Sequence, residues 1–354
     1  MLLPIAHPHR PAADLSRFYI VTPISNPCRY ESRYRLYWRF RDMCEMAGVK
    51  LITVEQAFGK RPFMVTDPGN PHHVQIRSIE ELWLKENLIN LGIARAVKLD
   101  PAAREVAWID ADVRPARAPI DWFEETWHQL QHYEFVQMFE TMIDLDRHFN
   151  SIGAPQNSFM ANYIKYGTPT VQDVKKIKER ERRRCCCCPP DCHSEYPGYP
   201  CGSSVFGRPG LAWAANVDAL NNVGGLIDYS ILGAADWYMA HGLIGSMEAV
   251  ARDFHTSAYE RRLFHWQTLA ERWIKRDVGY VPGLVYHDFH GRKKLRGYET
   301  RGVILRRNRY NPDTDIKYDA FGQLQLESWE PRQIRLRDEI RAYFRSRDED
   351  STEI

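Results

Sequence analysis

The first third of the sequence alternates between short apolar strands and amphipathic helices. We predict, in chain order, a strand at Phe18–Pro23, a helix around Leu36–Ala47, a strand at Val49–Val54, a helix across Leu82–Val97 and a strand at Val106–Ile109. The helices are indicated by apolar residues at helical spacing. Alternation of this kind is typical of a largely parallel sheet with helices packed on it. The sequence therefore predicts an α/β fold.

Local signals indicate where the helices begin. Ser78 and Glu81 have the spacing of a capping box, so we expect the second helix to begin there. Asp121 is expected to cap the next helix, Trp122–His132. Lys85 and Asn87 follow the capping box, and we expect both side chains to be exposed to solvent.

Two aspartates, Asp110 and Asp112, directly follow the apolar strand at Val106–Ile109. Strand side chains alternate, so both carboxylates are expected on one side where the strand leaves the sheet. Paired carboxylates suit Mg²⁺ or Mn²⁺, and open α/β sheets bind ligands at the carboxyl ends of their strands. The pair therefore predicts a nucleotide diphosphate site, whereas the alternative is a solvated turn after an edge strand.

The loop expected after the first strand adds further pocket candidates. Thr22, Pro23 and Ile24 are placed to contact a base and ribose in a nucleotide-binding α/β fold. An ordinary strand-to-helix loop is the alternative interpretation of these three residues.

Four further motifs follow in order: Gly210–Ala214, Gly224–Asp228, Leu232–Ala240 and His287–Arg292. Together with Asp110 and Asp112 this series resembles GT-A glycosyltransferases, over roughly Phe18 to Tyr298. The resemblance implies a single Rossmann-like domain whose mixed, mostly parallel sheet carries helices on both faces. It also implies that Asp110 and Asp112 bind nucleotide and metal, that Asp236 is the catalytic base, and that His287 or His290 completes the metal site.

Other residues supply alternatives for these roles. Asp228 is the first replacement for Asp236 as the base. Arg292 and the basic residues behind it suit a leaving diphosphate, although a structural histidine beside a solvated basic turn accounts for the same pattern. A second Asp-x-Asp, Asp144 and Asp146, is expected to cap a turn and is next in line for the metal.

Regular patterns fade across the segment from about 150 to 202, which we interpret as an irregular insertion. It holds a basic run, Lys175–Arg184, and six cysteines between Cys185 and Cys201. Cys188, Cys192 and His193 are conceivable ligands of a structural Zn²⁺, but adjacent cysteines cannot all face one ion. A basic surface insertion is the expected reading.

Regular structure is predicted to resume after the insertion. We expect a strand at Leu211–Ala214 and helices at Val217–Asn222, Ala235–Leu243, Ala258–Lys275 and Ile334–Arg345. The domain is assigned to residues 15–330, followed by a charged helix and tail at 331–354. The last residues, Asp348–Ile354, are expected to be disordered.

Composition narrows the class of protein. The 354 residues are 44% hydrophobic and carry a formal net charge of +2, which is typical of a globular chain and excludes neither a polyanionic nor a neutral partner. No apolar run is long enough to span a membrane, and the prolines near Met1 do not fit a signal peptide. We therefore expect a cytoplasmic protein.

These observations predict a metal-dependent glycosyltransferase that uses Mn²⁺ or Mg²⁺. The donor is expected to be a nucleotide-diphosphate sugar, UDP-linked, and the acceptor a hydroxyl on a glycan, a small molecule or, as in phage-type enzymes, a hydroxymethylated DNA base. Two alternatives stay open: a non-enzymatic nucleic-acid-binding protein acting through the basic Cys-rich insertion, and a metal-dependent nucleotidyltransferase.

Overall fold

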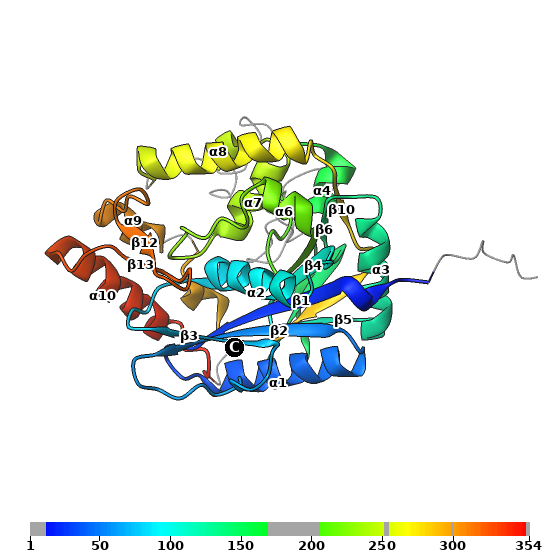
Figure 1. Ribbon diagram of the computed structural model, residues 1–354, viewed down its shortest axis with the longest axis horizontal. Coiled ribbons are helices and arrows are strands. Elements are labelled where there is room, and N and C mark those ends of the chain that lie inside the picture. Colours follow the sequence, from blue (N-terminus) through cyan, green and yellow to red (C-terminus); the bar gives the residue numbers. More distant parts are fainter. Residues whose placement is uncertain (1–11, 169–205, 251–254, 299–300, 352–354) are drawn as a thin grey trace, which may run out of the picture.

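The computed structural model describes residues 12–168, 206–250, 255–298 and 301–351. Within them the chain builds a seven-stranded sheet (Figure 1). Its order is β10 (Val278–Tyr280), β6 (Phe135–Gln137), β9 (Ala212–Asn216), β4 (Glu105–Ile109), β1 (Phe18–Ser25), β2 (Lys50–Phe58) and β3 (His73–Ser78). Only β9 runs antiparallel to its neighbours within this sheet. The predicted α/β fold with a mixed, mostly parallel sheet is confirmed, and it is compatible with a single Rossmann-like domain.

The strand order reverses beside β1. The chain proceeds from β1 outward to β2 and β3 and then returns to place β4 on the other side of β1. In open α/β sheets such a reversal leaves a crevice outside the carboxyl ends of the two central strands. Asp110 directly follows β4, so the Asp-x-Asp motif lies at this reversal point.

Helices cover both faces of the sheet. Tyr19 and Val21 of β1 join one apolar core with α2 (Lys85–Leu99), whereas Phe18 and Ile20 join another with α1 (Glu31–Met46) and α3 (Pro119–Leu130). This division follows from the alternation of side chains along a strand. Gly92 lets α2 approach closely, because a Cβ there would lie 2.4 Å from Cγ1 of Val21.

A second, smaller sheet continues from the Asp-x-Asp turn. Its order is β5 (Val113–Pro115), β11 (Leu284–His287), β7 (Thr141–Leu145) and β8 (Ser151–Asn157). Strand β11 pairs antiparallel with β5 and parallel with β7. The pairing brings the end of β11 beside Asp112, although the two segments are far apart in sequence.

The remaining elements pack mainly around the α2 side of the sheet (Figure 1). They are α4 (Phe159–Tyr166), α6 (Val217–Asn222), α7 (Ala235–Leu243), α8 (Ser257–Trp273), α9 (Gly302–Arg307), the hairpin of β12 (Ile316–Tyr318) with β13 (Leu324–Leu326), α10 (Pro331–Ser346) and the short turns η1 (Leu15–Arg17), η2 (Met247–Ala249) and η3 (Lys293–Arg296). The four helices predicted after the insertion are thus confirmed to within a few residues. Among the described residues, no helix combines the length and apolar character needed to span a bilayer.

The predicted capping signals are wrong. Ser78 ends β3, and its hydroxyl bonds with the backbone of Glu80 two residues on. The helix begins only at Lys85. The carboxylate of Glu81 does not cap it, because it forms ion pairs with Arg341 and Arg345 of α10. Asp121 lies inside the first turn of α3, after the cap.

The insertion is shorter than predicted. Strand β8 and helix α4 occupy Ser151–Tyr166, a stretch that the sequence assigned to irregular structure. Helix α4 has a side-chain cap, because the Ser158 hydroxyl accepts a hydrogen bond from the amide of Ala161 at 3.1 Å. The basic run and the zinc candidates Cys188, Cys192 and His193 lie outside the described residues.

The end of the chain is ordered as far as it is described, contrary to the predicted disorder. Asp350 accepts hydrogen bonds from the amides of Glu31 and Ser32 at 2.7 and 2.8 Å, and so caps α1. Glu349 is buried and pairs with Arg33. The tail also lies against Gly291, where a Cβ would be 2.9 Å from the Cα of Glu349.

Candidate functional site

A tight turn carries the chain from the central sheet into the smaller one. The amide of Asp110 donates to the carbonyl of Leu211 at 2.8 Å, and the amide of Val113 donates to the carbonyl of Asp110 at 3.0 Å. The turn fixes Asp110 and Asp112 at the carboxyl end of β4 and the start of β5. Both aspartates are thus placed where the strand order reverses.

Asp112, His287 and His290 form a cluster with metal-ligand geometry. Their ligand atoms all lie within 4.8 Å of one another. Nε2 of His290 is 3.2 Å from Oδ2 of Asp112 and 3.2 Å from Nε2 of His287. The sequence left open which of the two histidines lies beside Asp112. In the structure both His287 and His290 lie beside it.

A buried oxygen of Asp112 that lacks a hydrogen-bond partner also indicates a cation at this cluster. Oδ1 of Asp112 is buried and has no hydrogen-bond partner, and Nε2 of His287 lies 3.7 Å away, beyond hydrogen-bond distance. A buried carboxylate oxygen is costly to leave without a partner. One carboxylate with two imidazoles suits Mn²⁺ or another transition ion better than Mg²⁺, which prefers oxygen ligands.

Asp144 orients His287. The two residues are register partners on the parallel strands β7 and β11, and Nδ1 of His287 lies 2.7 Å from Oδ1 of Asp144. Arg208 is close to the other oxygen of Asp144, at 3.7 Å. When Nδ1 donates to a carboxylate, Nε2 keeps its lone pair for a metal.

The second Asp-x-Asp was therefore interpreted correctly for only one of its two residues. Asp146 caps a turn, as predicted, by accepting hydrogen bonds from the amides of His148 and Asn150 at 2.7 and 2.9 Å. Asp144 lies within β7 and contacts a histidine instead. Its role depends on a strand pairing across 143 residues, which no local pattern encodes.

The charge states of the cluster favour a cation. Burial, together with the nearby charge of Arg296, holds the pKa of His290 well below its usual range, so the ring is neutral and able to ligate. Burial raises the pKa of Asp112, and the neighbouring His287 opposes this. A divalent ion would favour the ionised carboxylate, since opposite charge nearby stabilises the charged form.

A second cluster joins Asp110 to α2 and α7. Nζ of Lys85 lies 2.5 Å from Oδ1 of Asp110. Burial alone would lower the pKa of Lys85, but the charges of Asp110, Glu86 and Asp236 outweigh burial and raise it. Burial raises the pKa of Glu86 to about 8, and the charge of Asp236 adds to this. Lys85 is therefore paired with Asp110 and lies within the electrostatic influence of Asp236, which corrects the expectation that it is exposed.

Asp236 occupies the first turn of α7, as predicted. Its Oδ1 accepts a hydrogen bond from the amide of Trp237 at 2.8 Å. Its Oδ2 faces Gly210, where a Cβ would lie only 2.4 Å away. The absence of a side chain at Gly210 thus makes room for this carboxylate beside the turn that carries Asp110.

Other predicted residues lie elsewhere. Thr22, Pro23 and Ile24 are inside β1, which extends to Ser25, so the expected loop position is wrong. The Thr22 hydroxyl is buried and donates to the carbonyl of Ile109 at 2.9 Å, and Ile24 is buried in an apolar cluster. The Thr22 hydroxyl and the Ile24 side chain are therefore used in contacts within the protein and are not available to a ligand.

Asp228 has structural partners. Asn87 donates to its Oδ2 at 3.2 Å, and Tyr318 of β12 donates to its Oδ1 at 2.7 Å. Asn87 is itself buried, which corrects the prediction that it is exposed. Asp228 is thus engaged with the β12 and β13 hairpin, whereas Asp236 contacts the loop at Gly210.

The basic segment after the histidines contributes a buried cation. Arg292 precedes η3 directly, and Arg296 at its end is buried, with Nη2 3.4 Å from the carbonyl of Gly291. The charge of Arg296 stabilises ionised Asp112 and disfavours protonated His290. Sequence reasoning singled out Arg292 and did not distinguish Arg296, because a run of four basic residues does not show which one is buried.

Comparison of the sequence with models of known protein families and with curated proteins finds no match. The geometry of these residues therefore carries the functional argument.

Proposed function

We propose that this chain is a metal-dependent glycosyltransferase that moves a sugar from a nucleotide-diphosphate donor, a UDP-sugar, to a hydroxyl acceptor. The observation that carries the proposal is the cluster of Asp112, His287 and His290 directly outside the carboxyl end of β4, at the reversal of strand order. Ligands of open α/β sheets bind at such a point. Two further carboxylates lie near the same turn: Asp110 is two residues before Asp112, and Asp236 faces Gly210, which precedes the residue that pairs with Asp110.

The cluster would hold Mn²⁺, which supplies Lewis-acid stabilisation of a departing diphosphate. Asp112 and the two histidines would bind the ion, and Asp144 keeps His287 in the tautomer that allows it. Arg296, whose charge acts on Asp112, would supply positive charge for the phosphates, and Arg292 is the second candidate for this role. Asp110, which pairs with Lys85, would bind the ribose of the donor.

Asp236 is the proposed general base. Its position in the first turn of α7 stabilises the carboxylate through the helix dipole. Lys85 lies near both Asp236 and Asp110 and so lessens the repulsion between them. A base of this kind accepts the proton of an acceptor hydroxyl in an inverting transfer.

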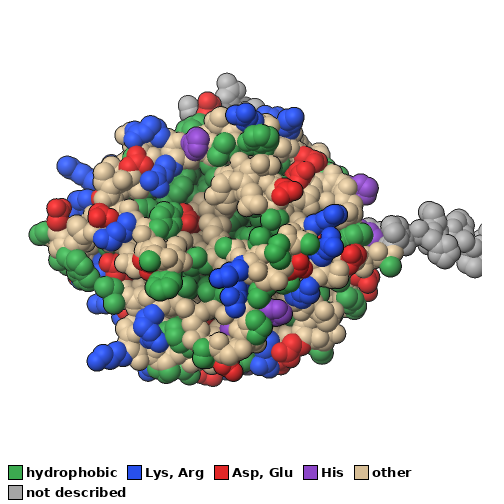
Figure 2. Space-filling view, viewed as in Figure 1, with side chains coloured by type: hydrophobic (Ala, Val, Ile, Leu, Met, Phe, Trp, Pro, Cys, Tyr) green, Lys and Arg blue, Asp and Glu red, His purple; other side chains and the backbone are tan. Residues whose placement is uncertain are grey.

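A neutral acceptor is favoured over DNA. On the face seen in Figure 2, Lys and Arg side chains are interspersed with Asp and Glu, and they do not gather into one basic field. Recognition of a phosphate backbone requires clustered cations. We therefore propose a glycan or small-molecule hydroxyl first and a hydroxymethylated DNA base second, and Figure 2 bears only on the face that it shows, since the basic run Lys175–Arg184 lies outside the described residues.

The decisive experiment measures slow sugar release from donors. The protein is incubated with UDP-, GDP- and TDP-sugars and with Mn²⁺, Mg²⁺, Zn²⁺ or Fe²⁺, because the same three ligands could also hold zinc or ferrous iron. We expect release from a UDP-sugar with Mn²⁺. A parallel assay with nucleoside triphosphates and sugar phosphates detects pyrophosphate, the product of a nucleotidyltransferase. Absence of sugar release from every donor would contradict the proposal, and pyrophosphate formation would favour the alternative enzyme.

A further inference from the structure

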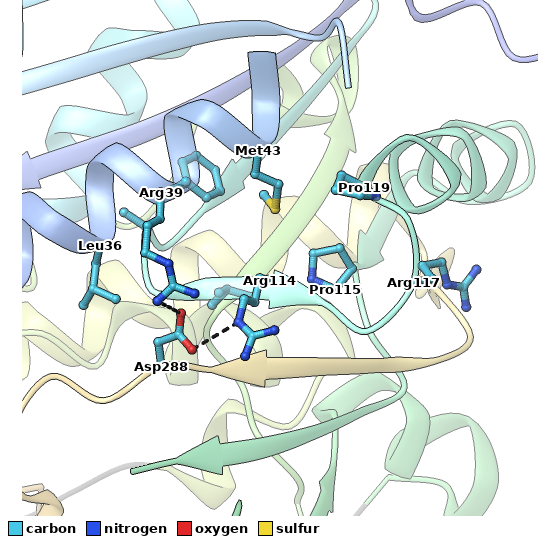
Figure 3. Close-up of a pocket in the computed structure, with 11 residues that line it drawn as sticks. Leu36, Arg39, Met43, Arg114, Pro115, Arg117, Pro119 and Asp288 are labelled. Atoms are coloured by element: carbon cyan, nitrogen blue, oxygen red, sulfur yellow. Dashed lines mark hydrogen bonds and ion pairs between the residues drawn. The ribbon is translucent and has the colours of Figure 1, made fainter. Parts of the chain in front are cut away.

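A pocket of about 190 Å³ lies between α1 and the segment that leads from β5 into α3. Leu36, Phe40 and Met43 line it from α1, and Pro115 and Pro119 line it from the opposite side. Figure 3 shows the labelled members of this set converging from the two elements. The floor of the pocket is therefore apolar. Its volume is sufficient for a single ring, since a cavity of about 150 Å³ holds one benzene molecule.

The rim of the pocket is cationic. Asp288 lies between two guanidinium groups: its carboxylate is 3.2 Å from Nη1 of Arg39 and 3.2 Å from Nε of Arg114 (Figure 3). Arg117 lies at the other end, where its guanidinium donates to the carbonyl of Pro282 and forms no ion pair with the described residues. Three guanidinium groups and one carboxylate thus line the pocket, and two of the three guanidinium groups pair with that carboxylate.

An aromatic ring holds two of these arginines in place. The guanidinium carbons of Arg39 and Arg114 lie 4.8 and 5.9 Å from the ring centre of Phe149. Cation–π contacts of this kind restrict the guanidinium groups without neutralising their charge. Two of the three arginines are therefore held in fixed positions at the mouth of an apolar pocket.

The pocket is separate from the metal cluster but shares a wall with it. His287 points toward Asp112 and Asp144, whereas the next residue, Asp288, points toward Arg39 and Arg114. The amide of Asp288 donates to the carbonyl of Asp112 at 2.7 Å. The segment His287–Asp288 therefore forms the boundary between the two sites.

We propose that this pocket binds a small organic anion, a carboxylate attached to a single ring or short acyl chain. The apolar floor accommodates the body of such a ligand, and Arg117 supplies a guanidinium group that is not already paired with a carboxylate. Guanidinium groups match carboxylates in charge and in planar geometry. The proposal does not depend on the glycosyltransferase function, because none of these contacts requires a metal or a nucleotide.

The test titrates the full-length protein with benzoate by calorimetry, at low ionic strength and in the presence of EDTA. We expect millimolar or tighter binding of benzoate and about tenfold weaker binding of benzamide, its neutral isostere, since only benzoate gains from the arginines. Arg117→Gln should weaken benzoate binding about fivefold. Arg41→Gln is the control, because it removes the same positive charge from α1 at a residue that pairs with Asp42 outside the pocket.

A second variant locates the ligand. Met43→Trp should fill the apolar floor and abolish benzoate binding, and circular dichroism checks that it folds. If it does not fold, Arg117→Gln and benzamide still decide the question. Equal affinity for benzoate and benzamide, unchanged binding by Arg117→Gln, retained binding by folded Met43→Trp, or no binding of benzoate at all would each overturn the proposal.

Discussion

His287 is held between two carboxylates, with Nδ1 2.7 Å from Oδ1 of Asp144 and Nε2 3.7 Å from Oδ1 of Asp112. The short contact fixes the ring orientation, and the long one leaves room for an ion between Nε2 and Asp112. Because a donor at Nδ1 leaves a lone pair at Nε2, the pairing with Asp144 determines the chemistry available on the other side. The two Asp-x-Asp motifs thus meet at one histidine.

Asp112→Asn should abolish Mn²⁺ binding. The change removes an anionic ligand while keeping the side-chain volume, so the fold should stay intact. Its effect should exceed the roughly 10- to 100-fold loss that follows from disturbing an outer-shell partner. Calorimetric titration with Mn²⁺, alone and with UDP, measures it.

Asp121→Asn is the matched control for this variant, since Asp121 is exposed in the first turn of α3. It should bind Mn²⁺ as the unmodified protein does. Unchanged Mn²⁺ affinity in Asp112→Asn would show that the metal cluster is assigned incorrectly.

Asp144→Asn should weaken Mn²⁺ binding by about 10- to 100-fold. The amide can no longer hold the Nδ1 proton of His287 as strongly, so the tautomer that leaves Nε2 free becomes less dominant. Nitrogen NMR shifts of the His287 ring report this change directly, and a purely structural role would not move them.

Asp146, the other aspartate of the Asp144–Asp146 motif, is the control for Asp144→Asn. Asp146→Asn should lower the thermal unfolding temperature through loss of its turn contacts, because Asp146 accepts hydrogen bonds from His148 and Asn150. Its Mn²⁺ affinity should stay unchanged. A loss of affinity as large as that in Asp144→Asn would mean that both variants act through general destabilisation.

The centre of the main sheet and the place of Asp112 beside it were predictable from the sequence because their signals are local. Apolar runs mark β1, β2 and β4, and the paired aspartates follow β4 directly. The smaller sheet was not predicted, because strands such as β5 and β11, of three and four residues, are too short for a periodic pattern. The resemblance, by contrast, drew attention to His287 and His290 without any knowledge of that sheet.

Two of the wrong predictions share a physical cause. Ser78 and Glu81 have capping-box spacing, but Glu81 pairs with Arg345, which lies 264 residues away. The tail is ordered as far as Ser351, the last described residue, because Asp350 caps α1 across more than 300 residues. In the first case a distant arginine determines the local structure, and in the second the uncapped end of a distant helix does. A prediction made from neighbouring residues includes neither of these partners.

Glu86→Gln should change how stability depends on pH. The folded-state pKa of Glu86, about 8, lies above its ordinary value because the carboxyl is buried. A raised carboxyl pKa contributes stability that is fully present below the unfolded pKa, near about 4.3, and is lost as pH rises through about 8. Relative to Glu86→Gln, the unmodified protein should therefore lose stability between pH 5 and 9, by at most about 1.4 kcal/mol per pH unit.

Urea unfolding of both proteins across this pH range measures the difference. Lys85 and Asp110 are present in both, so their titration largely cancels in the comparison. A stability difference that does not vary with pH would show that Glu86 is ionised in the folded state at neutral pH.

Asp236→Asn should keep donor binding but lose sugar transfer. A base acts only when the acceptor is deprotonated in the transition state, so its removal lowers kcat and leaves the affinity for UDP with Mn²⁺ near normal. Asp228→Asn is the comparison variant: Asp228 bonds with Asn87 and Tyr318, so its loss should cost about 1 kcal/mol of stability and leave transfer largely intact. Transfer rates and UDP titrations on both variants separate the two roles. Loss of transfer in Asp228→Asn alone would reassign the base to Asp228, and a product that keeps the donor's anomeric configuration would remove the need for a base at Asp236 altogether.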